Sequence, residues 1–177
     1  MDASWSATAL GGAVAVMVAS ERPVLVCDLI LAEGNLSAGP EGFASFAEGR
    51  SEEEYVNDWF PNFIASRLED AKTEAGVLAI HLGMVQAAAP WAVYRMSQSL
   101  NAGSVQPSLR ERFISLDIPR AYFLGGRSEY DEEDLPLRTE LTQRGGDWVV
   151  VPDADHQMNV DNPEGFADAI ARRLRTH

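Results

Sequence analysis

The stretch Trp148-Val149-Val150-Val151-Pro152-Asp153-Ala154-Asp155-His156, followed closely by Asn162-Pro163-Glu164, decides the fold class. Its apolar run indicates a buried strand, and the loop after that strand carries a histidine. The Asn-Pro-Glu triplet has the order of a helix cap, a first-turn proline and an acidic first turn. Phe166, Ile170 and Leu174 then share one helix face. The stretch predicts a strand, a histidine-bearing loop and a final amphipathic helix.

Two further apolar runs have the same character. Leu29-Ile30-Leu31-Ala32 and Ala121-Tyr122-Phe123-Leu124 are both short and both end close to glycine, which is typical of strands buried on both faces of a parallel sheet. Helical patterns over 11–22 and 135–143 separate these runs, the first closed by a proline and the second by a Gly-Gly pair. The sequence predicts an α/β fold, a partial doubly wound parallel sheet.

The segment 37–110 has a different pattern. Ser51-Glu52-Glu53-Glu54 has the order of a capping box, and a helical pattern follows it with an interruption at Pro61. A second helical pattern runs from Met84 to Leu100. We therefore expect one domain with three parts: residues 1–36 and 111–177 form the core, and residues 37–110 form a helical insertion.

Composition excludes several classes of function. The net charge of −13 does not favour binding to the phosphates of nucleic acid. The one basic run, Arg172, Arg173 and Arg175, fits the last turn of a helix, where cations complement the helix dipole. Cys27 is the only cysteine, so neither a disulfide nor a Cys/His metal site is expected. The apolar stretch 7–19 lacks a basic front end and is too short to span a membrane. We expect a cytoplasmic protein without metal or cofactor.

Both ends of the chain resemble the α/β-hydrolases. In that family the catalytic histidine lies on the loop after the last strand, which corresponds to His156. The nucleophile lies at a strand-to-helix turn with the pattern G-x-S-x-G. Ala7-Thr8-Ala9-Leu10-Gly11-Gly12 is similar to this turn, with Ala9 in place of the serine, and the spacing to Pro23 supports that register. Ser6, within Ser4-Trp5-Ser6-Ala7-Thr8, is an alternative nucleophile that would leave three extra residues before the proline.

The resemblance leaves two candidates for the acid of the triad. The usual position follows the strand that ends at Leu124, but Ser128 stands where aspartate is expected, and Asp131 is a displaced substitute. Some family members carry the acid one strand earlier, where Glu33 lies 24 residues beyond Ala9. The phrase from Ala32 to Leu36 also resembles bacterial hydrolases with "EGNL" at this point. We favour Glu33.

The resemblance implies hydrolysis of esters, thioesters or C–C bonds of small apolar substrates. His156 would take the proton of the nucleophile and pass it to the leaving group, and the acid would orient the imidazole. The backbone amide of Leu10 would belong to the oxyanion hole. The helical insertion would be a cap, with Trp59, Trp91 and Tyr94 lining an apolar pocket. Because alanine replaces the nucleophile, the chain as written is expected to be inactive.

The resemblance covers nearly all of this chain but only about half of the family's fold. A sheet cut at the elbow strand would expose an unpaired edge, which favours pairing with another chain. A truncated start, a half-length dimer and a refolded variant would each account for this, and we expect a homodimer. The alternative function is a non-catalytic binding or assembly protein that dimerises through this edge.

Overall fold

The computed structural model describes residues 3–36, 47–71, 83, 87–102, 107–128 and 134–175. The chain divides into two compact units. The first combines Met1–Ser37 with Gln106–His177, and the second is Ala38–Val105. The sequence predicts a helical insertion over residues 37–110 within one domain, and this domain assignment stays a prediction. The two units are described separately below.

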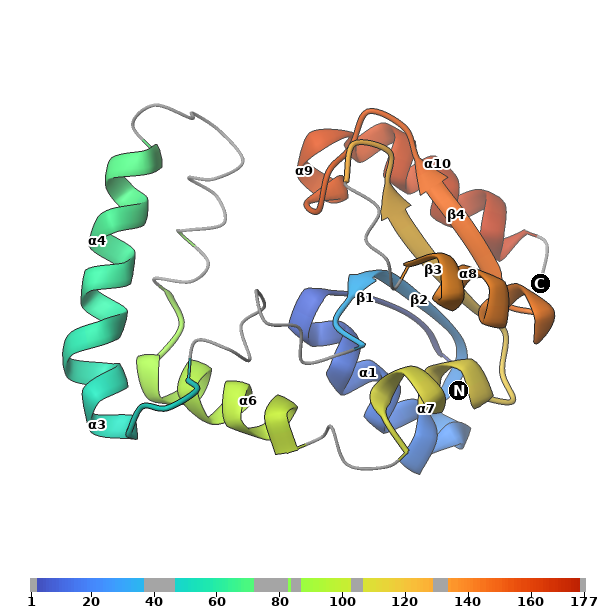
Figure 1. The fold of residues 1–177 in the computed structure, drawn as a ribbon. Coiled ribbons are helices and arrows are strands. Elements are labelled where there is room, and N and C mark those ends of the chain that lie inside the picture. Colours follow the sequence, from blue (N-terminus) through green and yellow to red (C-terminus); the bar gives the residue numbers. More distant parts are fainter. Residues whose placement is uncertain are drawn as a thin grey trace. The chain divides into compact units, whose positions relative to one another are not determined.

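The first unit is built on a four-stranded sheet in which every neighbouring pair of strands is parallel (Figure 1). The strands follow the order of the sequence: β1 (Ala3–Thr8), β2 (Val26–Gly34), β3 (Arg120–Gly125) and β4 (Asp147–Val151). The α/β class and the parallel sheet predicted from the apolar runs are confirmed. Because all strands point the same way, their carboxyl ends lie along one edge of the sheet.

Helices of the first unit cover both faces of this sheet, as Figure 1 shows. On one face, Ile30, Phe123 and Val151 pack with Phe166 and other residues of α10. The opposite face packs against α1 and α7, where the ring of Phe113 meets that of Tyr122 edge-on. The helical elements are α1 (Ala9–Glu21), the 3-10 turn η1 (Pro23–Leu25), α7 (Leu109–Ser115), α8 (Asp134–Gln143), α9 (Met158–Asp161) and α10 (Pro163–Leu174).

Strand β1 lies at one edge of the sheet. Among the described residues it pairs with β2 alone. Ser4, Ser6 and Thr8 are exposed, whereas most residues of β2 and all residues of β3 are buried. The other side of β1 therefore offers backbone N–H and C=O groups without strand partners in the part of the chain that the structure describes.

A buried ion-pair cluster lies near the amino-terminal ends of β2 and β4. Arg173 of α10 donates from Nη2 to Oδ1 of Asp28 at 3.0 Å, and its Nε lies 2.9 Å from Oδ2 of Asp147. The side chains of Arg173 and Asp28 are 3% and 6% exposed, whereas that of Asp147 is 45% exposed. The sequence interpretation placed Arg173 among the cations of the last turn, but its main partners are these two carboxylates.

The second unit is helical in its described parts, with α3 (Glu52–Glu54), the π-helical turn η2 (Tyr55–Trp59), α4 (Phe60–Ala71) and α6 (Pro90–Ala102). Ser51 caps α3, with the capping box expected from the sequence. The expected break at Pro61 is wrong, because α4 runs through it directly after the π turn. The wider turn accommodates the proline, which has no N–H and would crowd the carbonyl four residues earlier.

None of the described helices is long and apolar enough to cross a membrane.

Candidate active site

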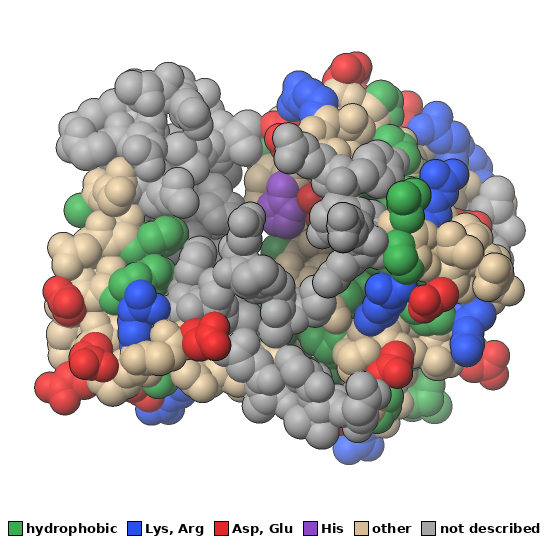
Figure 2. All heavy atoms as spheres, viewed as in Figure 1, with side chains coloured by type: hydrophobic (Ala, Val, Ile, Leu, Met, Phe, Trp, Pro, Cys, Tyr) green, Lys and Arg blue, Asp and Glu red, His purple; other side chains and the backbone are tan. Residues whose placement is uncertain are grey.

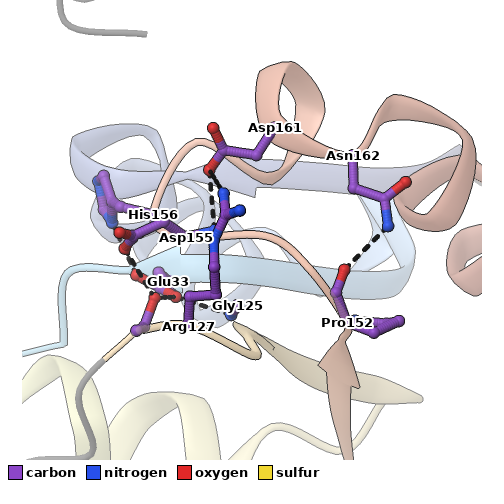
Figure 3. A network of polar contacts seen from close by, with 9 residues as sticks. Glu33, Gly125, Arg127, Pro152, Asp155, His156, Asp161 and Asn162 are labelled. Carbon is purple, nitrogen blue, oxygen red and sulfur yellow. Dashed lines mark hydrogen bonds and ion pairs between the residues drawn. The ribbon is translucent and has the colours of Figure 1, made fainter. Parts of the chain in front are cut away.

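Glu33 and His156 meet at the carboxyl edge of the sheet (Figure 3). Nδ1 of His156 lies 2.8 Å from Oε2 of Glu33, although the two residues are 123 positions apart in the sequence. The side chain of Glu33 is 12% exposed and that of His156 is 42% exposed. In the space-filling view of Figure 2, histidine atoms, coloured purple, are visible at the molecular surface. The carboxylate is thus enclosed while part of the imidazole remains accessible.

The second carboxylate oxygen of Glu33 is held by donors at the end of β3. The backbone N–H of Gly125 donates to Oε1 at 2.8 Å, and the hydroxyl of Ser128 donates to the same atom at 2.6 Å. The two oxygens therefore have different roles, because Oε1 anchors the side chain and Oε2 faces the imidazole. Short hydrogen bonds to a carboxylate are among the stronger ones in proteins.

The two ionisable groups shift each other's titration. Burial on its own would raise the pKa of Glu33, but the hydrogen bonds from His156, Ser128 and the Gly125 amide outweigh burial and lower this pKa. The hydrogen bond to Glu33 raises the pKa of His156, against the opposing effect of burial. Both shifts favour the charged pair, and the Nδ1 contact leaves Nε2 on the far side of the ring.

The histidine loop is fixed to the sheet by backbone contacts. Gly126 N–H donates to the Val151 carbonyl and Arg127 N–H to the Ala154 carbonyl, both at 2.8 Å. A Cβ at Gly125 would lie 2.6 Å from the Ala154 carbonyl oxygen, so this approach requires glycine. The turn after β3 and the loop after β4 therefore form one connected support for His156.

Ala9 lies at the turn from β1 into α1, beside the end of β2. Its carbonyl accepts a hydrogen bond from Asn35 N–H at 3.0 Å. Its φ of 45° is in the left-handed region, which is unfavourable for a residue with a Cβ. The other non-glycine residues with positive φ in the described ranges are Glu33 and Asp153, also at carboxyl ends of strands. Such strain gathers at functional sites, although strain alone assigns no role.

Small residues allow the turn at Ala9 to form. A Cβ at Gly12 would lie 2.6 Å from the Cα of Gly34, so α1 can approach the end of β2 only without a side chain there. Thr8, the residue before α1, makes no side-chain cap hydrogen bond, and the first turn holds no acidic residue. The first amides of α1, including that of Leu10, belong to the group that has no partner within a helix.

The alternative nucleophile lies elsewhere. Ser6 is within the body of β1, paired with Ile30, three residues before the strained turn. The structure thus brings Glu33 and His156 into contact and places Ala9 on the neighbouring strand end, while Ser6 occupies a regular strand position. The other acid candidate, Asp131, lies outside the described residues, as does Met84.

Two of the expected pocket residues have described contacts with other residues of the second unit. Trp59 stacks on Tyr55 with 4.9 Å between ring centroids, and the hydroxyl of Tyr94 donates to the Arg50 carbonyl at 2.9 Å. Trp91 is 51% exposed. Their role in binding a substrate stays a prediction. In the described parts of the chain, no group of three His, Cys, Asp or Glu side chains is placed to hold a metal ion.

Sequence reasoning missed Ser128 as a partner of Glu33. It identified this position only as one where aspartate was expected and serine was found. The signal was present nonetheless, because the residues after two adjacent parallel strands meet at one edge. Asp155 was missed as well: its Oδ1 accepts the backbone N–H of His156 at 2.8 Å.

Known proteins resemble this chain in sequence and in fold, although no protein-family model matches it. The 2-succinyl-6-hydroxy-2,4-cyclohexadiene-1-carboxylate synthase of Salmonella heidelberg is 27% identical over 179 residues, covering 94% of this chain and 66% of that protein. The enol-lactonase from Burkholderia xenovorans superposes with a TM-score of 0.69 at 17% identity, over 98% of this chain and 66% of that one. An esterase from Thermogutta terrifontis gives 0.70 at 20% identity, over 99% and 65%.

The chain has the α/β-hydrolase fold. It spans 66% of the length of the Salmonella synthase, slightly less than two thirds. In α/β-hydrolases generally, a sharp and strained turn from strand to helix presents the nucleophile, and the histidine follows later in the chain. The assignment of Ala9 and His156 to these two positions stays a prediction.

Proposed function

We propose that the chain carries the acid and the histidine of a nucleophile–histidine–acid triad, with Ala9 at the position of the nucleophile. Glu33 is the acid and His156 the base. The observation that carries the proposal is the 2.8 Å contact between Nδ1 of His156 and Oε2 of Glu33. This contact fixes the tautomer in which Nε2 can accept a proton from a nucleophile and return it to a leaving group.

The strained turn supports Ala9 as the nucleophile position. A serine there would stand at the start of α1, where the amide of Leu10 and its neighbours could stabilise an oxyanion. Ala9 has no hydroxyl, so formation of an acyl-enzyme is closed to the chain as written. Loss of the serine from such a triad leaves only the residual catalysis that comes from binding and the oxyanion hole.

The chemistry of the lineage is hydrolysis of esters, thioesters or C–C bonds in small apolar substrates. The names of the similar proteins, a synthase, an enol-lactonase and an esterase, agree with a site that handles small carbonyl compounds. Trp59, Trp91 and Tyr94 are the proposed apolar lining of the substrate pocket. No cofactor enters the proposed mechanism.

Restoring the hydroxyl tests this proposal directly. We expect Ala9→Ser to gain turnover of p-nitrophenyl acetate or butyrate and to form a fluorophosphonate adduct at position 9, located by mass spectrometry. Adding His156→Ala should abolish both gains. A folded Ala9→Ser protein with neither turnover nor adduct would contradict the proposal. If the original chain is labelled, and Ser6→Ala removes the label, the nucleophile is Ser6 instead.

A non-catalytic assembly role is the second candidate, favoured by the edge position of β1. Its outer side has no strand partner among the described residues, and a strand of a second copy could pair there. Light scattering should then give the mass of a homodimer, and Trp5→Pro in β1 should shift it toward monomer. A monomer at all concentrations would contradict this role.

A further inference from the structure

Ser128 lies between two carboxylates at the carboxyl edge of the sheet. Its Oγ is 2.6 Å from Oε1 of Glu33 and 3.2 Å from Oδ1 of Asp155. A serine hydroxyl has one proton to donate. The shorter contact identifies Glu33 as the acceptor of that proton, and Asp155 already accepts the backbone N–H of His156.

The direction of the Glu33 side chain depends on these contacts. A glutamate has three rotatable side-chain torsions, and one contact to an imidazole does not fix all of them. Gly125 N–H and the Ser128 hydroxyl both donate to Oε1, which directs Oε2 toward His156. The amide belongs to the end of β3 and comes with the strand, so the serine is the partner that a side-chain change can remove.

We infer that Ser128 is a positioning residue, whose hydroxyl holds the Glu33 carboxylate in line with Nδ1 of His156. The inference rests on the proposed function for its meaning in catalysis, and on the three contacts for its geometry. Ser128 acts only through Glu33. It stands at the position where the family resemblance led us to expect an aspartate, so here a hydroxyl supports an acid supplied by the neighbouring strand.

The charged groups around this contact come from three segments. Glu33 lies on β2, Arg127 on the turn after β3, and Asp155, His156 and Asp161 follow β4. Arg127 is 3.5 Å from the 4%-exposed carboxylate of Asp161, which also accepts the N–H of Asp155. The Ser128 hydroxyl thus lies within hydrogen-bonding distance of both carboxylates and gives its one proton to Glu33, the nearer of the two.

Nuclear magnetic resonance of the original chain provides the test. The variants are Ser128→Ala, which removes the hydroxyl, and Ser128→Thr, which keeps it. The control is Ser99→Ala, because that hydroxyl only donates to the Arg95 carbonyl within α6. The two readouts are the downfield proton resonance of the His156 Nδ1–H and the titration of the Glu33 side-chain carbon, assigned with His156→Asn and Glu33→Gln.

We expect the alanine variant to broaden the Nδ1–H resonance or move it upfield, and to raise the pKa of Glu33 by about one unit, because a donor to the charged form is lost. The threonine and Ser99→Ala proteins should keep both signals. An unchanged resonance and an unchanged Glu33 titration in Ser128→Ala would overturn the inference. If the alanine variant does not fold, Ser128→Val against Ser128→Thr repeats the comparison with side chains of equal shape.

Activity in the Ala9→Ser background separates the two proposals. If both hold, Ser128→Ala lowers kcat about tenfold with little change in KM, and Ser128→Thr restores it. If Ala9→Ser is inactive while the resonance changes occur as expected, the proposed function fails and the positioning of Glu33 by Ser128 stands. If Ala9→Ser is active and Ser128→Ala changes neither rate nor resonance, the inference about Ser128 fails alone.

Discussion

Removing the buried cation Arg173 should strongly destabilise the first unit. In Arg173→Met the side chain keeps a similar length, but Asp28 loses the Nη2 donor at 3.0 Å. Asp28 is 6% exposed on β2, so water cannot replace the lost partner. The partly exposed Asp147 can turn toward solvent. The consequence is an uncompensated charge inside the packed end of the sheet.

The magnitude follows from the two contacts taken separately. Breaking a buried pair by removing one partner costs about 3–5 kcal/mol, because the other charge stays buried. The contact with Asp147, whose side chain is 45% exposed, adds less than about 1 kcal/mol. We therefore expect Arg173→Met to lower the free energy of unfolding by about 3–5 kcal/mol at neutral pH.

The loss should depend on pH. Burial raises the pKa of Asp28 in the native chain, and Arg173 offsets part of that rise. Without the arginine this pKa rises further, so the folded state binds a proton more readily than the unfolded chain. Stability is then gained as pH falls through the raised pKa. The destabilisation at pH 7 should shrink at pH 5.

Native-state hydrogen exchange of the β3 amides is the assay, because it reports on opening of the first unit. The neighbouring exposed residue supplies a matched control: Arg172→Met should change the exchange by less than about 0.5 kcal/mol. Adding Asp28→Asn to Arg173→Met should recover much of the loss. Equal losses in the Arg172 and Arg173 variants, or an Arg173 loss independent of pH, would show that an unpaired, buried Asp28 charge is not the cause.

Three further predictions concern the turn at Ala9 and the side chain of Glu33. In urea denaturation, Gly12→Ala should lower the free energy of unfolding by about 1–3 kcal/mol, because its Cβ would lie 2.6 Å from the backbone of Gly34. The control Gly11→Ala should raise the free energy of unfolding by roughly 0.5–1 kcal/mol, because its added Cβ would have no neighbour nearer than 3.9 Å. Ala9→Gly should raise the thermal midpoint by relieving the positive φ, with a gain of about 0.5–1 kcal/mol, and an unchanged midpoint would argue against strain there. The stability lost in Glu33→Gln should be greatest between pH 4.5 and 6.5, which are the ordinary pKa values of a glutamate and a histidine. The loss should shrink as pH falls through the lowered pKa of Glu33, and also as pH rises through the raised pKa of His156. A loss that is constant across this range in pH-dependent denaturation would contradict that pairing.

The apolar runs predicted the sheet because they are a local property of the sequence. The run Leu29–Ala32 marks the centre of β2, but the strand extends from Val26 to Gly34. Asp28 lies inside it, and a charge within a strand is acceptable there only because Arg173 arrives from the other end of the chain. A contact over 145 positions leaves no local pattern, so both the strand start and the buried arginine were missed.

The candidate site could be predicted as far as a motif specifies it. The family resemblance named Glu33 and His156, and the structure brings their side chains together. The sequence showed only that Ser128 stands where an aspartate is expected. Its contact with Glu33 could not be predicted, because that carboxylate comes from another strand. The π turn before Pro61 left no signal either, since the same residues fit an interrupted helix and a widened one.

The conformation of Ala9 allows backbone geometry to be studied apart from chemistry. A residue with the smallest Cβ-bearing side chain holds the left-handed turn, so the neighbouring strand end and the close approach of Gly12 to Gly34 maintain it without help from a hydroxyl. Exchange of the side chain at position 9 should then alter reactivity and leave the backbone in place. Variants with glycine, alanine, serine and cysteine at this one position would share the same backbone. Glycine would relieve the backbone strain, alanine would provide no nucleophile, and serine and cysteine would provide a hydroxyl and a thiol nucleophile.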